Sequence, residues 1–315
     1  MIRRIHQRSR TLPTPMAGLA LGVASLGWGM ENALPLHGWG QIAGALIACA
    51  LLAGLVVRYT FHFDTLKNDL AHPVVGSIVP TFAMCLMVIS NALTHLSLTV
   101  GAVLWGIAVV IHICALSTFI YHRLKDPQLD HMVPSWFVPP VGIIVADVSF
   151  PGIPALLPIA QVLFTIGLIS YAILLPVMLY RLIFCSEVPN QAKPTIAILA
   201  APASLSLAGY LTITPNPNLF LCAVLLGIAI LMTFAVYFAF LRLLRLQFSP
   251  GYAAFTFPMA IGATALYKTA NLVSTYPNAE QYVTQIRALA HFELAIAFIV
   301  ISYVLTLYLK NLKNF

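Results

Sequence analysis

Three ionisable side chains interrupt long apolar stretches of the sequence: Asp147, Lys268 and Glu293. A charge inside such a stretch is costly in free energy, so each of these residues is a candidate for a functional role. We expect Lys268 and Glu293 to form an ion pair between adjacent helices. Two other hypotheses stay open, namely proton coupling through Glu293 or Asp147 and attraction of anions by Lys268.

The patterns that enzymes and metal sites require do not occur in the sequence. The nine histidines show no metal-ligand spacing, and there is no HExxH, GxSxG or P-loop motif and no carboxylate pair suited to intramembrane proteolysis. The five cysteines are odd in number and never spaced as CxxC, so they imply no disulfide framework. We therefore expect a protein that is not an enzyme and that holds no metal or cofactor.

The chain that carries these side chains is too apolar for a soluble protein. Of its 315 residues, 60% are hydrophobic and 8% are charged, whereas about a quarter of the residues in a soluble domain are charged. A helix that crosses the hydrocarbon core of a bilayer needs roughly 20 apolar residues. Ten such runs predict an all-α integral membrane protein. Its single transmembrane domain spans residues 1–315, with helices near 14–33, 40–61, 74–94, 98–120, 134–150, 157–180, 194–213, 218–241, 251–272 and 288–309.

The basic residues predict how these helices are oriented. With ten helices, 14 of the 16 Lys and Arg residues fall on one side, and only Lys268 and Arg287 fall on the other; the majority includes Arg3, Arg4 and Arg8. The positive-inside rule then places both termini in the cytoplasm. This predicts a multi-pass protein of the plasma membrane, which is the inner membrane in a bacterium. The net charge of +7 reflects this bias and is spread along loops, so it does not indicate a nucleic-acid partner.

Prolines recur at nearly even intervals along the odd-numbered helices. Steps of 65, 59, 63 and 56 residues separate Pro15, Pro80, Pro139, Pro202 and Pro258. An internal proline removes a backbone hydrogen bond and bends the helix. The pattern predicts five repeats of a kinked helix and a straight one, although Pro176 in helix six is an exception and membrane helices tolerate proline in general. Because unpaired carbonyls are costly in lipid, we expect the kinked helices to surround a central passage.

Small hydroxyl side chains on the odd-numbered helices are the candidate contacts inside this passage. They are Ser25, Ser90, Ser204, Ser206 and Thr264. Their other interpretation is ordinary helix packing, in which small and hydroxyl residues are common. The predicted passage has no ring of charge, which favours weak, non-selective passage of anions over tight binding of one substrate.

Five segments in order resemble one known family over nearly the whole chain. They are LPTPMAGLALG, HPVV, PSWFVPP, LAAPASLSLAGYL and FTFPMA. Together they are similar to the tellurite-resistance/dicarboxylate transporter family, which also includes plant guard-cell slow anion channels, yeast sulfite exporters and a fungal malate permease. The resemblance implies ten helices arranged as five hairpins around a pseudo-fivefold pore, assembled as a homotrimer in the lipid bilayer. Pro80 lies about a turn closer to Pro73 than the family pattern has it, so the bend in helix three is expected to be displaced.

The resemblance also implies that a phenylalanine from helix nine blocks the pore. By its position in FTFP this is Phe257, with Phe255 two residues earlier as the second candidate. The residue before a proline is pushed out of helical backbone geometry, so the Phe257 ring can be aimed at the axis. An apolar ring in a narrow passage excludes water and gates ion entry. The other interpretation is that Phe257 packs against lipid or a neighbouring helix.

Two functions follow from these expectations. The first is an anion channel, or channel-like transporter, for small inorganic or organic anions with a phenylalanine gate. The second is a proton-coupled carrier for dicarboxylate, sulfite or tellurite-type anions.

Overall fold

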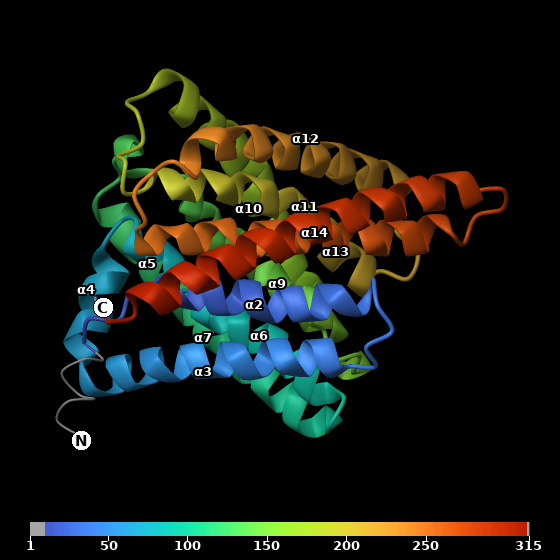
Figure 1. Ribbon diagram of the computed structural model, residues 1–315, viewed down its shortest axis with the longest axis horizontal. Coiled ribbons are helices and arrows are strands. Elements are labelled where there is room, and N and C mark those ends of the chain that lie inside the picture. Colours follow the sequence, from blue (N-terminus) through green and yellow to red (C-terminus); the bar gives the residue numbers. More distant parts are fainter. Residues whose placement is uncertain (1–9, 314) are drawn as a thin grey trace.

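Figure 1 shows the computed structural model, which describes residues 10–313 and 315. Over these residues the chain forms helices and loops without a strand, so the all-α class is confirmed. Arg3, Arg4 and Arg8, which contributed to the predicted orientation, lie outside the described residues. Within the described part, seven helices are long and apolar enough to cross a membrane: Trp39–Phe61, Val75–Thr94, Leu98–Lys125, Pro154–Phe184, Lys193–Ile213, Leu219–Leu243 and Glu280–Asn311.

Five helices run without interruption and lie toward the outside of the bundle. They are α3 (Trp39–Phe61), α7 (Leu98–Lys125), α10 (Leu157–Phe184), α12 (Leu219–Leu243) and α14 (Glu280–Asn311). Both α7 and α14 extend beyond the apolar runs that predicted them. Large apolar side chains on the outer faces of the five uninterrupted helices are exposed, for example Phe238 of α12 at 72% and Ile299 of α14 at 66%. Exposed apolar surface of this kind suits contact with lipid.

The other five segments change conformation beside a proline. In the last of them, η6 (Pro250–Phe255) is a 3₁₀-helix and α13 (Phe257–Val273) begins directly before Pro258. Because proline has no N–H to donate, the chain tightens into shorter-range bonds before it, such as Thr256 N–H to the Ala253 carbonyl at 3.2 Å. In the first segment, α2 (Met16–Glu31) follows Pro15, and in the second, α5 (Val75–Ile78) and α6 (Thr81–Thr94) lie around Pro80. The third segment consists of η2 (Pro134–Phe137), α8 (Val138–Val141), η3 (Gly142–Ile144) and α9 (Val145–Val148) around Pro139. In the fourth, η5 (Lys193–Ala200) is followed by α11 (Ala201–Ile213), which has Pro202 in its first turn.

These interrupted segments form the interior of the bundle. Helix α2 buries 13 of its 16 residues and α13 buries 13 of 17, whereas α14 buries only 8 of 32. The interior segments contact one another in a closed ring: α2 with α6, α6 with α9, α9 with α11, α11 with α13, and α13 again with α2. Each also contacts the uninterrupted helix that follows it in the chain, as α2 does with α3 and α13 with α14. Irregular backbone is tolerated at this depth because protein surrounds it.

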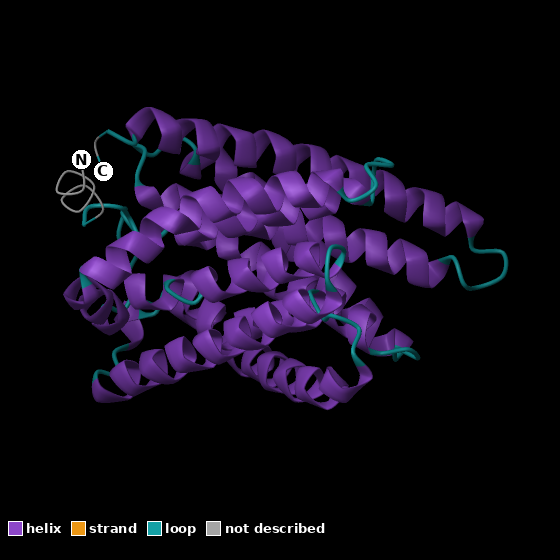
Figure 2. Cartoon of the chain, turned by 90° about the horizontal axis from the view of Figure 1, so that it is seen from below, coloured by secondary structure: helices purple, strands orange, loops and turns teal. Residues whose placement is uncertain are grey.

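The two ends of the bundle are distinct. Figures 1 and 2 show long helices running roughly side by side from one end to the other. The short helix α4 (Phe63–Ala71), the start of α2 and the C-terminal residue Phe315 lie together, and we call this the terminal end. The loop 274–279 between α13 and α14 lies at the opposite side, which we call the far end.

Candidate functional site

Two cavities follow one another inside the ring of interior segments. The larger, of about 60 Å³, lies toward the terminal end and is lined by residues from all five segments, among them Leu21, Met84, Val138, Ile198 and Phe257. The smaller, of about 10 Å³, lies one to two turns farther along the same segments and is lined by Ser25, Trp28, Val88, Val145, Val148, Leu205, Phe257, Ile261 and Thr264. The cavities therefore mark one line through the centre of the bundle.

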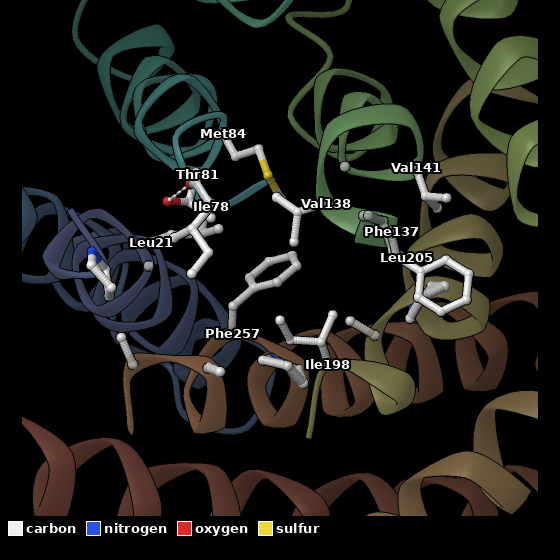
Figure 3. A pocket seen from close by; sticks show the side chains of 18 of the residues that line it. Leu21, Ile78, Thr81, Met84, Phe137, Val138, Val141, Ile198, Leu205 and Phe257 are labelled. Atoms are coloured by element: carbon white, nitrogen blue, oxygen red, sulfur yellow. Dashed lines mark hydrogen bonds between the residues drawn. The ribbon is translucent and has the colours of Figure 1, made fainter. Parts of the chain in front are cut away.

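The side chain of Phe257 lies between these two cavities. Phe257 and Leu205 are the two residues that line both of them. In Figure 3 the Phe257 ring projects from α13 into the larger cavity and toward Val138. Thr81 supplies the one hydroxyl among the lining side chains of the larger cavity, and it donates to the Ile78 carbonyl at 2.7 Å. The passage on this side of the ring is therefore apolar.

The bend that aims Phe257 is held by α2. The Thr256 hydroxyl is fully buried and lies within hydrogen-bonding distance of two carbonyls, those of Gly18 at 3.1 Å and Ala253 at 2.7 Å. A Cβ added to Gly22 would come within 2.4 Å of the Thr256 side chain and 3.1 Å of the Phe257 nitrogen. Only glycine at position 22 leaves room for this approach of α13 to α2. Sequence reasoning missed both residues, although the threonine of FTFP and the second glycine of GLALG were visible signals.

A Gly22→Ala variant is expected to unfold at a clearly lower temperature than the native protein. The added methyl group must displace Thr256, and overpacking of this kind costs about 1–3 kcal/mol. Gly18→Ala is the matched control on the same helix, because its Cβ would meet the Ala253 side chain at an ordinary 3.6 Å. Thermal unfolding of both variants in detergent makes the comparison. Equal unfolding temperatures for the two variants would contradict the close contact.

Phe255 does not take part in the passage, contrary to its prediction as a second gate residue. It lines neither cavity and is fully buried. Its ring lies 4.8 Å from that of Tyr252 and 5.3 Å from that of Phe240 on α12. The change from 3₁₀ to α-helix between residues 255 and 257 sends the two rings in different directions.

The predicted kink prolines divide in the same way. Pro202 and Pro258 line the larger cavity, as does Pro15. Pro80 and Pro139 lie next to residues that line the larger cavity, such as Thr81 and Val138, but line neither cavity themselves. The Pro139 carbonyl lies 2.8 Å from Nε2 of the buried His112 on α7.

Two of the five predicted hydroxyl contacts lie in the passage. Ser25 and Thr264 line the smaller cavity, and the buried Ser25 hydroxyl has no hydrogen-bond partner within the described chain. Thr264 donates to the Ala260 carbonyl at 3.1 Å. The other three line neither cavity and donate to carbonyls of their own segments: Ser90 to Met87, Ser204 to Ala200 and Ser206 to Pro202. Trp28 lines the smaller cavity and was not predicted.

The structure does not bring Lys268 and Glu293 together. No ion pair between them occurs among the residues described. Glu293, 2% exposed on α14, instead faces Gly262 of α13, where an added Cβ would lie 2.4 Å from its Oε2 atom. The expected ion pair is therefore wrong, because the carboxylate lies against Gly262, six residues and about 9 Å before Lys268 along α13.

Asp147 is a second buried carboxylate that forms no ion pair within the described chain. It is fully buried on α9, and neither carboxylate oxygen has a hydrogen-bond partner within the described chain. Its Cβ lies 3.3 Å from the position of an added Cβ on Gly209 of α11. Among the described residues there is no group of three or more His, Cys, Asp or Glu side chains that could hold a metal ion.

Comparisons with known proteins identify relatives and a family for this chain. An uncharacterized transporter of Methanocaldococcus jannaschii is 24% identical over 238 residues, which cover 68% of this chain and 69% of the relative. The tellurite resistance protein TehA homolog of Haemophilus influenzae is 25% identical over 286 residues, covering 84% of this chain and 85% of the relative. The resemblance to the tellurite-resistance/dicarboxylate transporters is thus confirmed. The family described as voltage-dependent anion channel matches residues 15–309, and the chain belongs to this family.

Proposed function

We propose that this multi-pass membrane protein conducts small anions through the passage inside its ring of interior segments, and that the Phe257 ring closes the passage. The observation that carries the proposal is the place of Phe257 between two cavities that follow the same line. An apolar side chain at such a constriction makes the entry of water and ions costly. Membership in a family described as anion channels supports the same conclusion.

The proposed pore needs three segments that are shorter than the seven long apolar helices. These are α2, the segment Pro134–Val148 and α13. Each lies in the ring and contacts protein on both sides, so its irregular ends need not face lipid. With them the chain has ten crossing segments arranged as five hairpins around a pseudo-fivefold axis, as one transmembrane domain over residues 1–315.

The chemistry of the passage suits anions that lose water easily. Its lining side chains carry no charge, and beyond the Phe257 ring the side chains with polar groups are Ser25, Thr264 and Trp28. The Ser25 hydroxyl, which has no hydrogen-bond partner within the described chain, can donate to a passing anion without holding it tightly, whereas Thr264 already donates to the Ala260 carbonyl. Such a passage discriminates weakly among small inorganic and organic anions.

The proposed setting is the plasma membrane, with both termini in the cytoplasm. The terminal end then faces the cytoplasm, in agreement with the excess of Lys and Arg in the loops at that end. The resemblance to the family further supports a homotrimer. Exposed apolar side chains on α7, α10 and α12 offer surface for lipid and for neighbouring subunits.

A second candidate function is proton-coupled anion transport. Two buried carboxylates favour it: neither Glu293 nor Asp147 forms an ion pair within the described chain, and neither oxygen of Asp147 has a hydrogen-bond partner there. A buried carboxyl group that can take up and release a proton is the usual means by which transporters couple protons to a substrate.

Current recording on reconstituted protein separates the two functions. For a channel, the reversal potential in a chloride gradient should follow the equilibrium potential of chloride and should not move when a pH gradient is added. For a proton-coupled carrier, the pH gradient should shift the reversal potential. A reversal potential that follows the cation would contradict both proposals.

A further inference from the structure

A third cavity lies at the far end, outside the two that flank Phe257. It has a volume of about 230 Å³ and lies between the last turns of α11 and α13 and the loop 215–217. Lys268, Asn271 and Thr214 supply its polar side chains. Unlike the apolar cavity of about 60 Å³ on the terminal side of Phe257, this cavity is lined by a cation and by neutral hydrogen-bonding side chains.

The polar side chains of this cavity have no hydrogen-bond or ion-pair partners among the described residues. Within the described residues, the Lys268 ammonium forms no ion pair, and the side chains of Lys268, Asn271 and Thr214 form no hydrogen bond. The ammonium has three donors, the amide has two and the hydroxyl has one. Six donors in one hollow, with no carboxylate paired to the lysine, favour an anionic ligand.

Lys268 also continues the face of α13 that lines the passage. Phe257, Ile261 and Thr264 line the smaller cavity, and Lys268 follows them at the spacing i, i+4, i+7, i+11. Residues at this spacing share one face of a helix. At 1.5 Å per residue, Lys268 lies about 16 Å beyond Phe257 along the helix axis. On α13, the cavity therefore lies beyond Thr264 along the face that lines the passage.

We propose that Lys268, Asn271 and Thr214 form a binding site for a small carboxylate or oxyanion at the far mouth of the passage, and that this site raises the local anion concentration there. The supply of anions rests on the proposed function, whereas binding at the site does not. The volume of about 230 Å³ accommodates a small anion together with part of its hydration shell. A cation at a concave mouth attracts anions most strongly at low ionic strength.

Binding is tested by protection of the Lys268 amine in the native full-length protein. The detergent-solubilised protein is acetylated with an uncharged reagent in the presence of malonate, a dicarboxylate probe, or of uncharged malonamide. Mass spectrometry then compares Lys268 with Lys310, an exposed lysine at the terminal end that reports any general effect of salt. A roughly threefold slower acetylation of Lys268 with malonate alone is expected from partial occupancy. Equal rates in malonate and malonamide would overturn the proposal.

Supply of anions is tested by current in a Phe257→Ala background, where the constriction is removed. With chloride at the far end at about 10 mM, Lys268→Gln should lower the inward-moving anion current about fivefold, and Lys268→Arg should keep it. The difference should vanish near 1 M salt because the charge is screened. Arg287 and Lys268 are the two Lys or Arg residues predicted for the far end, and Arg287 does not line the cavity. Arg287→Gln should therefore leave the anion current unchanged.

The two measurements separate this proposal from the function it rests on. If the Phe257→Ala background carries no anion current, the proposed function fails and the protection of Lys268 alone decides the site. If current flows and Lys268→Gln equals its parent at low salt, the supply role is overturned even when malonate protects the amine.

Discussion

A Phe257→Ala variant is expected to carry at least ten times the anion current of the native protein. Removing the ring joins the cavity of about 60 Å³ to the cavity of about 10 Å³ that lies behind it. The constriction then widens by the volume of a benzyl group, and water can enter. A tenfold increase needs a barrier only about 1.4 kcal/mol lower, which is small beside the cost of moving an ion past an apolar ring.

Phe255→Ala is the matched control for this experiment. It removes the same ring two residues earlier, where the side chain packs on Tyr252 and Phe240 instead of lining the passage. Loss of a packed phenylalanine costs about 3–5 kcal/mol, so Phe255→Ala should lower the unfolding temperature while the current stays at the native level. Phe257→Ala should have the smaller effect on stability, because its ring borders cavities on both sides.

A Glu293→Gln variant is expected to keep the fold and to gain anion current, with the gain growing from acidic to alkaline solutions. The carboxylate has no ion pair to lose within the described chain, so the amide costs little. When ionised, it adds a negative charge behind Gly262, one residue from Ile261 in the passage wall. At an effective dielectric constant of about 20, like charges roughly 10 Å apart repel by roughly 1–2 kcal/mol. Removing this repulsion should raise the current by about tenfold in alkaline solution.

The sign of this dependence on pH follows from the charge. In acid the native carboxyl group is protonated and neutral, so the currents of the native protein and of Glu293→Gln should converge. Glu280→Gln, at the exposed start of α14, serves as the control and should leave the current unchanged. Tyr237 on α12 interacts electrostatically with Glu293, and the Ser204 hydroxyl of α11 lies 3.9 Å from the position of an added Cβ on Gly262, which the carboxylate also faces. A stable Glu293→Gln protein with reduced current at every pH would contradict this electrostatic role and would favour proton-coupled transport.

The features that the sequence predicted well are those set by the backbone. Proline fixes where a helix can no longer donate its hydrogen bond, so the changes of conformation at Pro202 and Pro258 were readable from the chain. The apolar runs predicted the long helices, because hydrocarbon thickness sets their length. Phe257 was placed by its position before Pro258 together with the family resemblance, and the structure shows it between the two cavities.

The features that the sequence could not predict depend on how helices rotate against one another. Ser204 and Ser206 lie on a ring-forming helix yet line neither cavity, whereas Thr264 lines the smaller one, and no spacing along the chain distinguishes these positions. Lys268 and Glu293 form no ion pair, since the Glu293 carboxylate lies against Gly262, six residues before Lys268 on α13. Such close contacts arise from pairs of residues far apart in sequence, as Gly22 and Thr256 also show.

The sharpest test of a passage closed by Phe257 is the anion current of a graded series at position 257, measured in the same bilayers as Phe255→Ala. We expect a current that rises from Phe through Leu and Val to Ala at position 257, while Phe255→Ala stays at the native level. A current that is independent of side-chain size at position 257, or an equal rise in Phe255→Ala, would show that the Phe257 ring does not close an anion passage.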